Sequence, residues 1–173
     1  MTGLDEFREQ RKIQDSAGEA GHNPFHHFVN ADGALSFDGE LYAEGGIAIL
    51  AKAIHTYSVN KGWWPECKTD RNFGEVLALI HSEVSEALED YRNDLPMETM
   101  HYTFGLTKSS EFVLETPGGT VYGKPCGIAS EMADIIIRVL DACEAFNIPV
   151  EQALIEKHRY NLTRAYRHGG KKA

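Results

Sequence analysis

The stretch from Asn72 to Asp94 constrains the fold more than any other part of the chain, because it combines a helical apolar pattern with a stripe of acids. Its apolar residues recur at i, i+3, i+4 and i+7, the spacing that puts side chains on one face of an α-helix. They are Phe73, Val76, Leu77, Ile80, Val84, Ala87, Leu88 and Tyr91. We therefore expect this run to be the central helix of the domain and its apolar face to be core.

The acids of this helix form a stripe beside the apolar face. At about 100° per residue, Glu83, Glu86 and Asp90 fall together along one edge of that face. Acidic residues on an amphipathic helix usually only keep it soluble. A single stripe therefore indicates a solvated flank, and a second acidic stripe is needed before a metal site is favoured.

A second stripe of this kind lies on the helix predicted from Gly127 to about Phe146. There Glu131 and Asp134 stand three apart beside a wide apolar face, as Glu83 and Glu86 do on the central helix. If the two pairs face each other, the four carboxylates are stable together only when protons or cations neutralise them. Carboxylate oxygens suit Mg²⁺, with Mn²⁺ as the alternative. A ferritin-like di-iron site is disfavoured, because it needs Glu-x-x-His on two helices.

An apolar pattern predicts another helix from Gly46 to about Asn60, and two tryptophans follow it directly. Trp63 and Trp64 either pack in the core or line a pocket. Core packing is the simpler interpretation, because aromatic side chains contribute so much buried area. Trp63 is retained as a candidate wall of a substrate pocket.

The last predicted helix starts at Pro149, which suits a first helical turn, and runs to about Tyr166. Lys157, Asn161 and Arg164 lie at i, i+4 and i+7, so we expect them on one face. Cations suit the C-terminus of a helix, so this face is explained as a solvated basic flank unless an anionic ligand binds there.

Residues 95–125 differ in character, with β-branched and aromatic residues around a Thr116-Pro117-Gly118-Gly119 turn signal. They predict a small β-hairpin inserted between two helices. Such insertions often act as covers or as partner contacts, and the sequence leaves both roles open.

Composition limits the class of protein. A chain of 173 residues with 42% hydrophobic content fits one globular domain. The net charge of −9 disfavours binding to a nucleic-acid backbone, which needs a basic surface. No window approaches the roughly 18 apolar residues of a membrane span. Three cysteines without a CxxC pair argue against a disulfide framework, so we expect a soluble, cytoplasmic protein without a membrane partner.

Three segments together resemble the all-α nucleoside triphosphate pyrophosphohydrolases of MazG type. SEVSEALEDYR at 82–92 is similar to the family's ExxE helix, and EMADIIIRVLD at 131–141 to its ExxD helix. KHRYNLTRAYRHGGKK at 157–172 is similar to the Lys and Asn that follow. The resemblance covers residues 46–172 and leaves 1–45 as a polar N-terminal extension. It implies an all-α fold, a four- to five-helix bundle completed by oligomerisation as a homodimer or homotetramer. The hairpin-like insertion predicted at 95–125 is an addition to that bundle.

The resemblance also implies an activity. Family members use Mg²⁺ to cleave a (deoxy)nucleoside triphosphate between the α and β phosphates, giving the monophosphate and pyrophosphate in nucleotide-pool house-cleaning. Metal ions on the carboxylates would neutralise phosphate oxygens and lower the pKa of a bound water. The implied metal-binding and catalytic residues are Glu83, Glu86, Glu131 and Asp134, and the implied substrate-binding residues are Lys157, Asn161, Arg164 and Trp63.

The chain departs from the family pattern at two points. Ser82 stands where many members have an additional Glu, and 44 residues separate Glu86 from Glu131, more than the usual interval. The alternative function is therefore a non-catalytic nucleotide-binding or oligomerisation module that has kept the fold and lost turnover.

Overall fold

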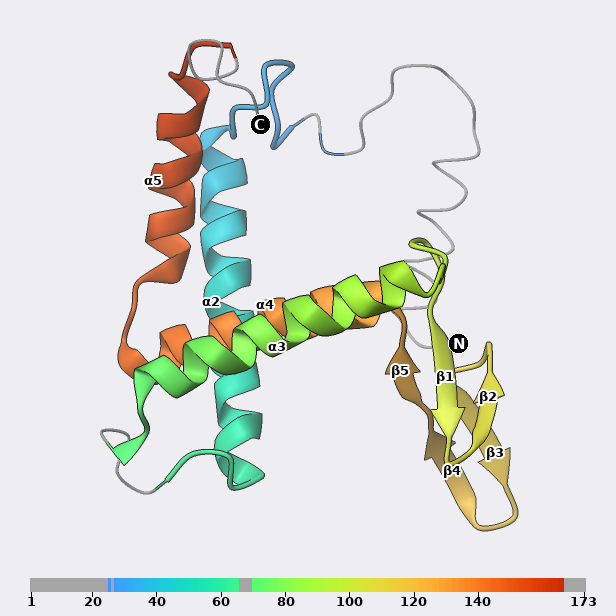
Figure 1. Ribbon diagram of the computed structural model, residues 1–173. Coiled ribbons are helices and arrows are strands. Elements are labelled where there is room, and N and C mark those ends of the chain that lie inside the picture. Colours follow the sequence, from blue (N-terminus) through green and yellow to red (C-terminus); the bar gives the residue numbers. More distant parts are fainter. Residues whose placement is uncertain (1–24, 26, 66–69, 167–173) are drawn as a thin grey trace. The chain divides into compact units, whose positions relative to one another are not determined.

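The computed structural model describes residues 25, 27–65 and 70–166. Residues 1–24 and 26, most of the predicted N-terminal extension, lie outside the described residues, as does the basic tail from 167 onward. The described part contains four helices and five strands (Figure 1). The helices are α2 (Phe37–Asn60), α3 (Phe73–Arg92), α4 (Ile128–Phe146) and α5 (Val150–Leu162). The strands are β1 (His101–Phe104), β2 (Thr107–Ser109), β3 (Val113–Thr116), β4 (Gly119–Tyr122) and β5 (Lys124–Cys126).

The predicted all-α fold class is wrong, because the strands form two small antiparallel sheets and the fold is mixed α/β. The hairpin around the turn signal is confirmed: β3 pairs with β4, with Thr116 opposite Gly119. The prediction missed the second sheet, which has the order β2-β1-β5. In that sheet His101 lies opposite Cys126, a pairing between residues too distant in the sequence for periodicity to reveal.

The predicted helices are present, with shifted ends. α3 starts where the pattern predicts, because the Asn72 side chain accepts a hydrogen bond of 2.8 Å from the Gly74 backbone N–H. α2 starts at Phe37, nine residues before the predicted Gly46. Ser36 caps that start, since its Oγ accepts from the Gly39 N–H at 3.1 Å. α5 ends at Leu162, so the helix does not reach the predicted Tyr166.

The chain divides into two compact units, each of which is described by itself. The terminal unit comprises residues 1–47 and 151–173, and the central unit comprises residues 48–150. The central unit therefore contains α3, α4, all five strands and the last part of α2. None of the helices in the described ranges has the length and apolar character needed to cross a membrane.

In the central unit, α3 and α4 run side by side, and the strands lie beyond the ends where α3 stops and α4 begins (Figure 1). The buried apolar residues Trp64, Val76, Ala142 and Ala145 form its core, with Phe146 packed against them. Edge-to-face ring contacts of Phe146 with Trp64 and Phe73, at centroid distances of 5.8 and 5.0 Å, join α4 to the Trp63–Trp64 segment and to α3.

The buried face of α3 differs from the predicted one. Val76 and Glu83 are buried, and Ile80, Ala87 and Asp90 are half-buried. The centre of the predicted apolar face remains exposed: Leu77, Val84, Leu88 and Tyr91 have exposed fractions of 45–56%. At about 100° per residue, the centre of the packed face is rotated by about 60° from the centre of the predicted face, toward the acids. The packing of α3 on α4 therefore buries Glu83, half-buries Asp90 and leaves an apolar stripe exposed.

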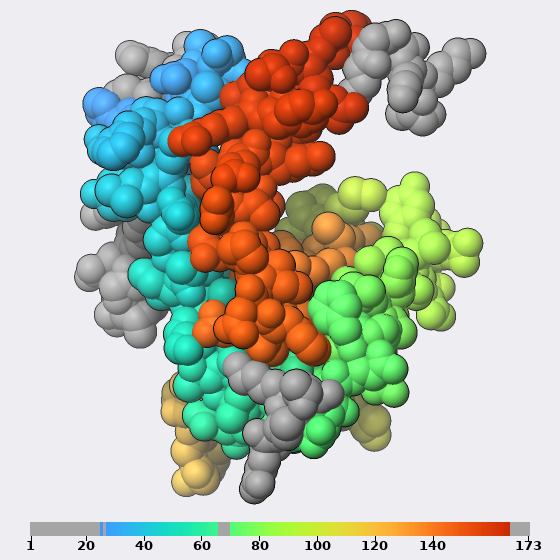
Figure 2. All heavy atoms as spheres, turned by 90° about the vertical axis from the view of Figure 1, so that its left-hand side faces the viewer, coloured from blue at the N-terminus to red at the C-terminus, as the bar shows by residue number. Residues whose placement is uncertain are grey.

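In the terminal unit, α5 packs along the first part of α2 (Figure 2). The Arg159 guanidinium forms an ion pair with the Glu40 carboxylate, and Nε of Arg159 donates to Glu40 Oε1 at 2.6 Å. His158 Nε2 lies 2.9 Å from the Gly33 carbonyl oxygen. Ile155 is the buried apolar residue of α5. These contacts fix the register of α5 against the segment that precedes and starts α2.

Candidate metal centre and adjoining pocket

Three of the four predicted metal ligands converge between α3 and α4. Glu83, Glu86 and Glu131 each offer a carboxylate oxygen, and these atoms all lie within 4.8 Å of one another. We call these three residues the acid cluster. Glu83 and Glu86 stand three apart on α3, so they share a face, and Glu131 in the first turn of α4 meets them from the other helix. The convergence of the two acidic stripes is the arrangement that the sequence predicts.

The acid cluster is graded in exposure. Glu83 is buried, Glu131 is half-buried and Glu86 is exposed. A cluster with a buried floor and an open side can hold an ion and still admit a ligand. Its donor atoms are all carboxylate oxygens, which fit a hard cation such as Mg²⁺ or Mn²⁺.

The electrostatics of Glu131 reflect its crowded surroundings. Burial raises the pKa of its carboxyl group, and the negative charges of Glu86, Asp134, Glu83 and Asp90 raise it further. Like charges held in a partly desolvated place disfavour ionisation. A proton or a cation at this position therefore relieves repulsion that the ionised cluster would otherwise carry.

Asp134, the fourth predicted ligand, lies beside the acid cluster and is not among the three residues whose oxygens converge. Burial raises the pKa of its carboxyl group first, and the charge of Glu83 raises it further. The positive charges of Arg138 and Lys124 act in the opposite direction. Asp134 therefore lies within the electrostatic influence of one acid and two cations.

Arg138 neutralises the buried acid. Its Nη2 atom lies 2.6 Å from Glu83 Oε1, and the Glu83 side chain is only 6% exposed. Arg138 stands one turn after Asp134 on α4, so both side chains leave the same face of that helix. Within the described residues, the ion-pair partner of the buried Glu83 carboxylate is thus a guanidinium.

A pocket of about 200 Å³ adjoins this ion pair. Arg138 and Asp134 belong to its lining, together with aromatic, charged, polar and aliphatic side chains. The lining includes Tyr57, Trp63, Arg71, Asp134, Arg138 and Asp141. We call it the lateral pocket. Trp63, a predicted substrate-binding residue, lines this pocket and is 67% exposed, whereas Trp64 is buried in the core.

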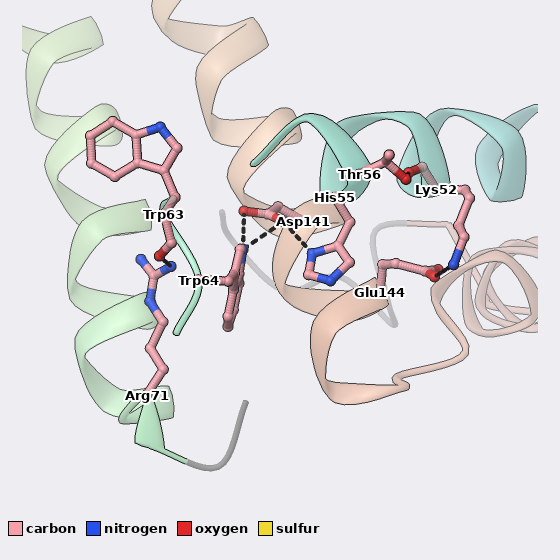
Figure 3. Close-up of polar contacts among 8 residues, drawn as sticks. All are labelled: Lys52, His55, Thr56, Trp63, Trp64, Arg71, Asp141 and Glu144. Atoms are coloured by element: carbon pink, nitrogen blue, oxygen red, sulfur yellow. Dashed lines mark hydrogen bonds and ion pairs between the residues drawn. The ribbon is translucent and has the colours of Figure 1, made fainter. Parts of the chain in front are cut away.

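Asp141, which lines the lateral pocket, belongs to a hydrogen-bonded triad (Figure 3). Trp64 Nε1–H donates to both carboxylate oxygens of Asp141 at 3.0 Å. His55 Nδ1 lies 2.8 Å from Asp141 Oδ1, and the His55 side chain is 6% exposed. We call His55, Trp64 and Asp141 the Asp141 triad. It ties α2, the Trp63–Trp64 segment and α4 together and fixes the position of the Asp141 side chain.

Arg71 forms another part of the wall. Its Nη1 donates to the Trp63 carbonyl oxygen at 2.8 Å, and its guanidinium carbon lies 4.3 Å from the centroid of the Trp64 ring (Figure 3). These contacts hold Arg71 in place without any carboxylate. The lateral pocket therefore has two guanidinium groups, of which Arg138 is paired with an acid and Arg71 with a carbonyl and a ring.

No match was found for this chain among known protein families, curated proteins or solved structures. The functional interpretation therefore rests on the site itself.

The remaining predicted substrate-binding residues belong to the terminal unit. Lys157 and Asn161 are exposed on α5, and Arg164 follows the end of that helix. Lys157 Nζ and Arg164 Cζ lie 5.5 and 6.0 Å from the centroid of the Tyr160 ring. The two cations thus gather around one aromatic ring, and their role in binding a substrate stays a prediction.

Sequence reasoning did not single out Arg138, Arg71 or Lys124 as parts of the site. Arg138 has a signal in the sequence, because it falls on the same helical stripe as Glu131 and Asp134. Lys124 lies on β5, inside the insertion, and Arg71 lies just before the α3 cap. Their approach to α4 depends on tertiary packing, for which the sequence offers no local pattern.

Ser82, the departure from the family pattern, has a local role. Its hydroxyl donates to the Leu79 carbonyl oxygen of the preceding turn at 2.7 Å. It therefore takes part in the backbone hydrogen bonding of α3 and is not one of the converging groups of the acid cluster.

Proposed function

We propose that this protein is a Mg²⁺-dependent nucleotide pyrophosphohydrolase of MazG type, which cleaves a (deoxy)nucleoside triphosphate between its α and β phosphates. The observation that carries the proposal is the convergence of Glu83, Glu86 and Glu131 within 4.8 Å on two facing helices. The resemblance of the segments around these residues to the ExxE and ExxD helices of that family supports it.

The acid cluster and Asp134 would hold the metal, with Mg²⁺ or Mn²⁺ as the ion. A divalent cation bound there would neutralise charge on phosphate oxygens and would lower the pKa of a bound water, the chemistry that attack at phosphorus requires. Glu83 forms the buried floor of the site, and Glu86 and Glu131 form its accessible rim. Asp134 joins this rim to the lateral pocket, because it belongs to the wall of that pocket.

The lateral pocket supports a nucleotide as the substrate. The exposed Trp63 ring is a surface on which a base stacks, and base stacking on an aromatic side chain contributes about 1–3 kcal/mol. Arg138 and Arg71 offer donors for phosphate or base oxygens. A volume of about 200 Å³ takes part of a nucleotide, with the triphosphate extending toward the acids.

The exposed apolar stripe on α3, formed by Leu77, Val84, Leu88 and Tyr91, supports a homo-oligomer. Four large apolar side chains on one helical face are rarely left in water by a monomeric protein. We propose that a second copy covers them in a homodimer or homotetramer. A cytoplasmic location, expected from the cysteine usage, is part of the same proposal.

The test is a product assay with matched variants. Purified protein is incubated with each (d)NTP and Mg²⁺, and pyrophosphate and nucleoside monophosphate are quantified. We expect pyrophosphate from at least one nucleotide, with loss of at least about 100-fold in Glu83→Gln because a ligand to the metal is removed. Glu89→Gln is the control: it makes the same chemical change at an exposed position of the same helix outside the acid cluster, and it keeps activity.

Two outcomes decide against the enzyme. Nucleotide binding without release of pyrophosphate from any nucleotide supports the alternative, a non-catalytic nucleotide-binding or oligomerisation module. Equal loss of activity in Glu83→Gln and Glu89→Gln contradicts the assignment of the acid cluster as the metal site.

A further inference from the structure

Arg138 has two environments at once. Its Nη2 lies 2.6 Å from Glu83 Oε1, and the same residue lines the lateral pocket. Its side chain is 39% exposed, whereas that of Glu83 is 6% exposed. The arginine thus spans the boundary between the buried floor of the acid cluster and the space open to a ligand.

The pair with Glu83 has a clear electrostatic reason. A buried carboxylate without a counter-charge is costly, because it loses its solvation. In the described part of the central unit, Arg138 supplies that counter-charge. Glu83 is also a member of the acid cluster, so a divalent cation on the cluster uses the same carboxylate.

A cation on the acid cluster and the Arg138 guanidinium therefore oppose each other. Both are positive, and both need the charge of Glu83. An anionic group in the lateral pocket has the reverse effect, because it offers Arg138 another partner.

We propose that Arg138 is an internal counter-ion that couples the metal site to the lateral pocket. It leaves Glu83 when a divalent cation takes that carboxylate, and its guanidinium then holds a phosphate group of the ligand in the pocket. The identity of that ligand rests on the proposed function. Arg138 is in this sense a positioning residue whose partner depends on whether the metal is bound.

Arg71 is the matched control. It is the other arginine of the lateral pocket, and its contacts go to the Trp63 carbonyl and the Trp64 ring. It contacts no member of the acid cluster among the interactions of the described residues. Removal of Arg71 should therefore weaken anion binding in the pocket and leave metal binding as it was.

The first measurement is calorimetric titration of Mn²⁺ into the full chain without nucleotide. Competition by Arg138 lowers the metal affinity of the native protein, so Arg138→Met should bind Mn²⁺ more tightly. Coupling between two sites typically amounts to about 5- to 150-fold, and we expect a gain in that range. Arg71→Met should bind Mn²⁺ within about twofold of the native protein. A purely structural role of Arg138 would lower the affinity or leave it unchanged.

The second measurement uses deoxynucleoside monophosphates, which carry a phosphate and no cleavable anhydride. Mn²⁺ should strengthen their binding to the native protein, and by reciprocity they should strengthen binding of Mn²⁺ by the same factor. In Arg138→Met the factor by which each ligand strengthens binding of the other should fall to about the value that direct contact between metal and phosphate gives. In Arg71→Met this factor should equal that of the native protein. Equal coupling in the native protein and Arg138→Met overturns the proposal.

Folding of the variant is itself informative. Arg138→Met that is folded only when Mn²⁺ is present supports the proposal, because the ion then replaces the missing counter-charge. If the variant is unfolded with and without Mn²⁺, Arg138→Lys decides. Lysine keeps the positive charge and lacks the planar guanidinium group of arginine. It should therefore compete less well with Mn²⁺ for the Glu83 carboxylate, so Mn²⁺ should bind more tightly than to the native protein. Unchanged or weaker Mn²⁺ binding in Arg138→Lys overturns the proposal.

Failure of this inference differs from failure of the proposed function. Native protein that releases pyrophosphate while Arg138→Met binds Mn²⁺ as before overturns only the role of Arg138. Native protein that binds Mn²⁺, shows the coupling and cleaves no nucleotide overturns only the enzyme. Native protein that does not bind millimolar Mn²⁺ overturns both.

Discussion

Replacement of Asp141 by leucine should destabilise the protein more than any single ion-pair change at its surface. The carboxylate accepts from Trp64 Nε1 through both oxygens at 3.0 Å and lies 2.8 Å from His55 Nδ1. Hydrogen bonds to a charged group contribute about 1.5–3 kcal/mol each. Leucine removes this acceptor and leaves the buried Trp64 and His55 donors without their partner, while its similar size avoids a large cavity.

Two such interactions would sum to about 3–6 kcal/mol if they were independent. They share one carboxylate, which is 16% exposed, so water partly replaces it and we expect about 3 kcal/mol. The assay is urea denaturation of the metal-free protein, followed by tryptophan fluorescence, with comparison of the denaturation midpoint and the m-value.

Lys52→Met is the control for this experiment. Lys52 Nζ pairs with Glu144 Oε1 at 2.9 Å between the same two helices, but its side chain is 71% exposed. An exposed pair contributes about 0–1 kcal/mol. A loss below about 1 kcal/mol in Asp141→Leu, or equal losses in both variants, would refute the reasoning that the Asp141 triad holds α2 and α4 together.

Three further predictions follow from the same structure. The pKa values of Glu131 and Asp134 are raised, so the folded protein keeps protons that the unfolded chain has released. The metal-free protein should therefore lose stability as pH rises above the usual carboxylate range. Urea denaturation at several pH values should show that this loss of stability is smaller in Glu131→Gln, and smaller in the native protein with saturating Mg²⁺. Gly123→Ala should lower the stability of the folded protein by about 1–3 kcal/mol, because the added Cβ would lie 2.8 Å from side-chain atoms of Phe104 and Tyr102. Thermal unfolding measures this loss. Gly118→Ala is the control, because its Cβ would meet only Thr116 Oγ1, at 3.7 Å. Leu88→Glu should lower the mass found by light scattering to that of a smaller species, and an unchanged mass would exclude this stripe as the oligomer interface.

The helices were the predictable part of the fold. The ends of α3 and α4 follow from an Asn72 cap before one run and Gly127 and Asn147 at the two ends of the other. Those signals are local, so a single sequence reveals them. The start of α2 was missed because the glycines at 45 and 46 suggest a break, whereas Ser36 further upstream caps the helix.

The sheets were only partly predictable. The β3–β4 hairpin is local and has a turn signal, so it was found. The pairing of β1 with β5 joins Tyr102 to Pro125 across the whole insertion, and strands of three or four residues carry too little alternation to predict it.

The acidic residues of the candidate site could be predicted from the sequence, and its basic residues could not. Paired acids at i and i+3 on two helices indicate a convergence, since each spacing is set by helix geometry alone. The prediction of the face on which α3 packs was wrong. The predicted apolar face includes Leu77, Val84 and Leu88, and these side chains are exposed in the structure. Periodicity shows which residues share a face, and it does not show what covers that face.

The contact between Arg138 and Glu83 is an example of what the sequence could not predict. Both residues were visible on their stripes, yet an ion pair of 2.6 Å between them depends on the register of α3 against α4. That register is a tertiary property. It decides which acid is buried and which cation neutralises it, and so it decides that Arg138 lies between the acid cluster and the lateral pocket.

The most direct test of the central claim is a crystal structure of the full chain grown with Mn²⁺, with an anomalous difference map measured at the manganese absorption edge. We predict an anomalous peak between the carboxylates of Glu83, Glu86 and Glu131, with Arg138 moved away from Glu83. A map from fully saturated crystals with no peak at the acid cluster, or with manganese bound only elsewhere, would contradict the account.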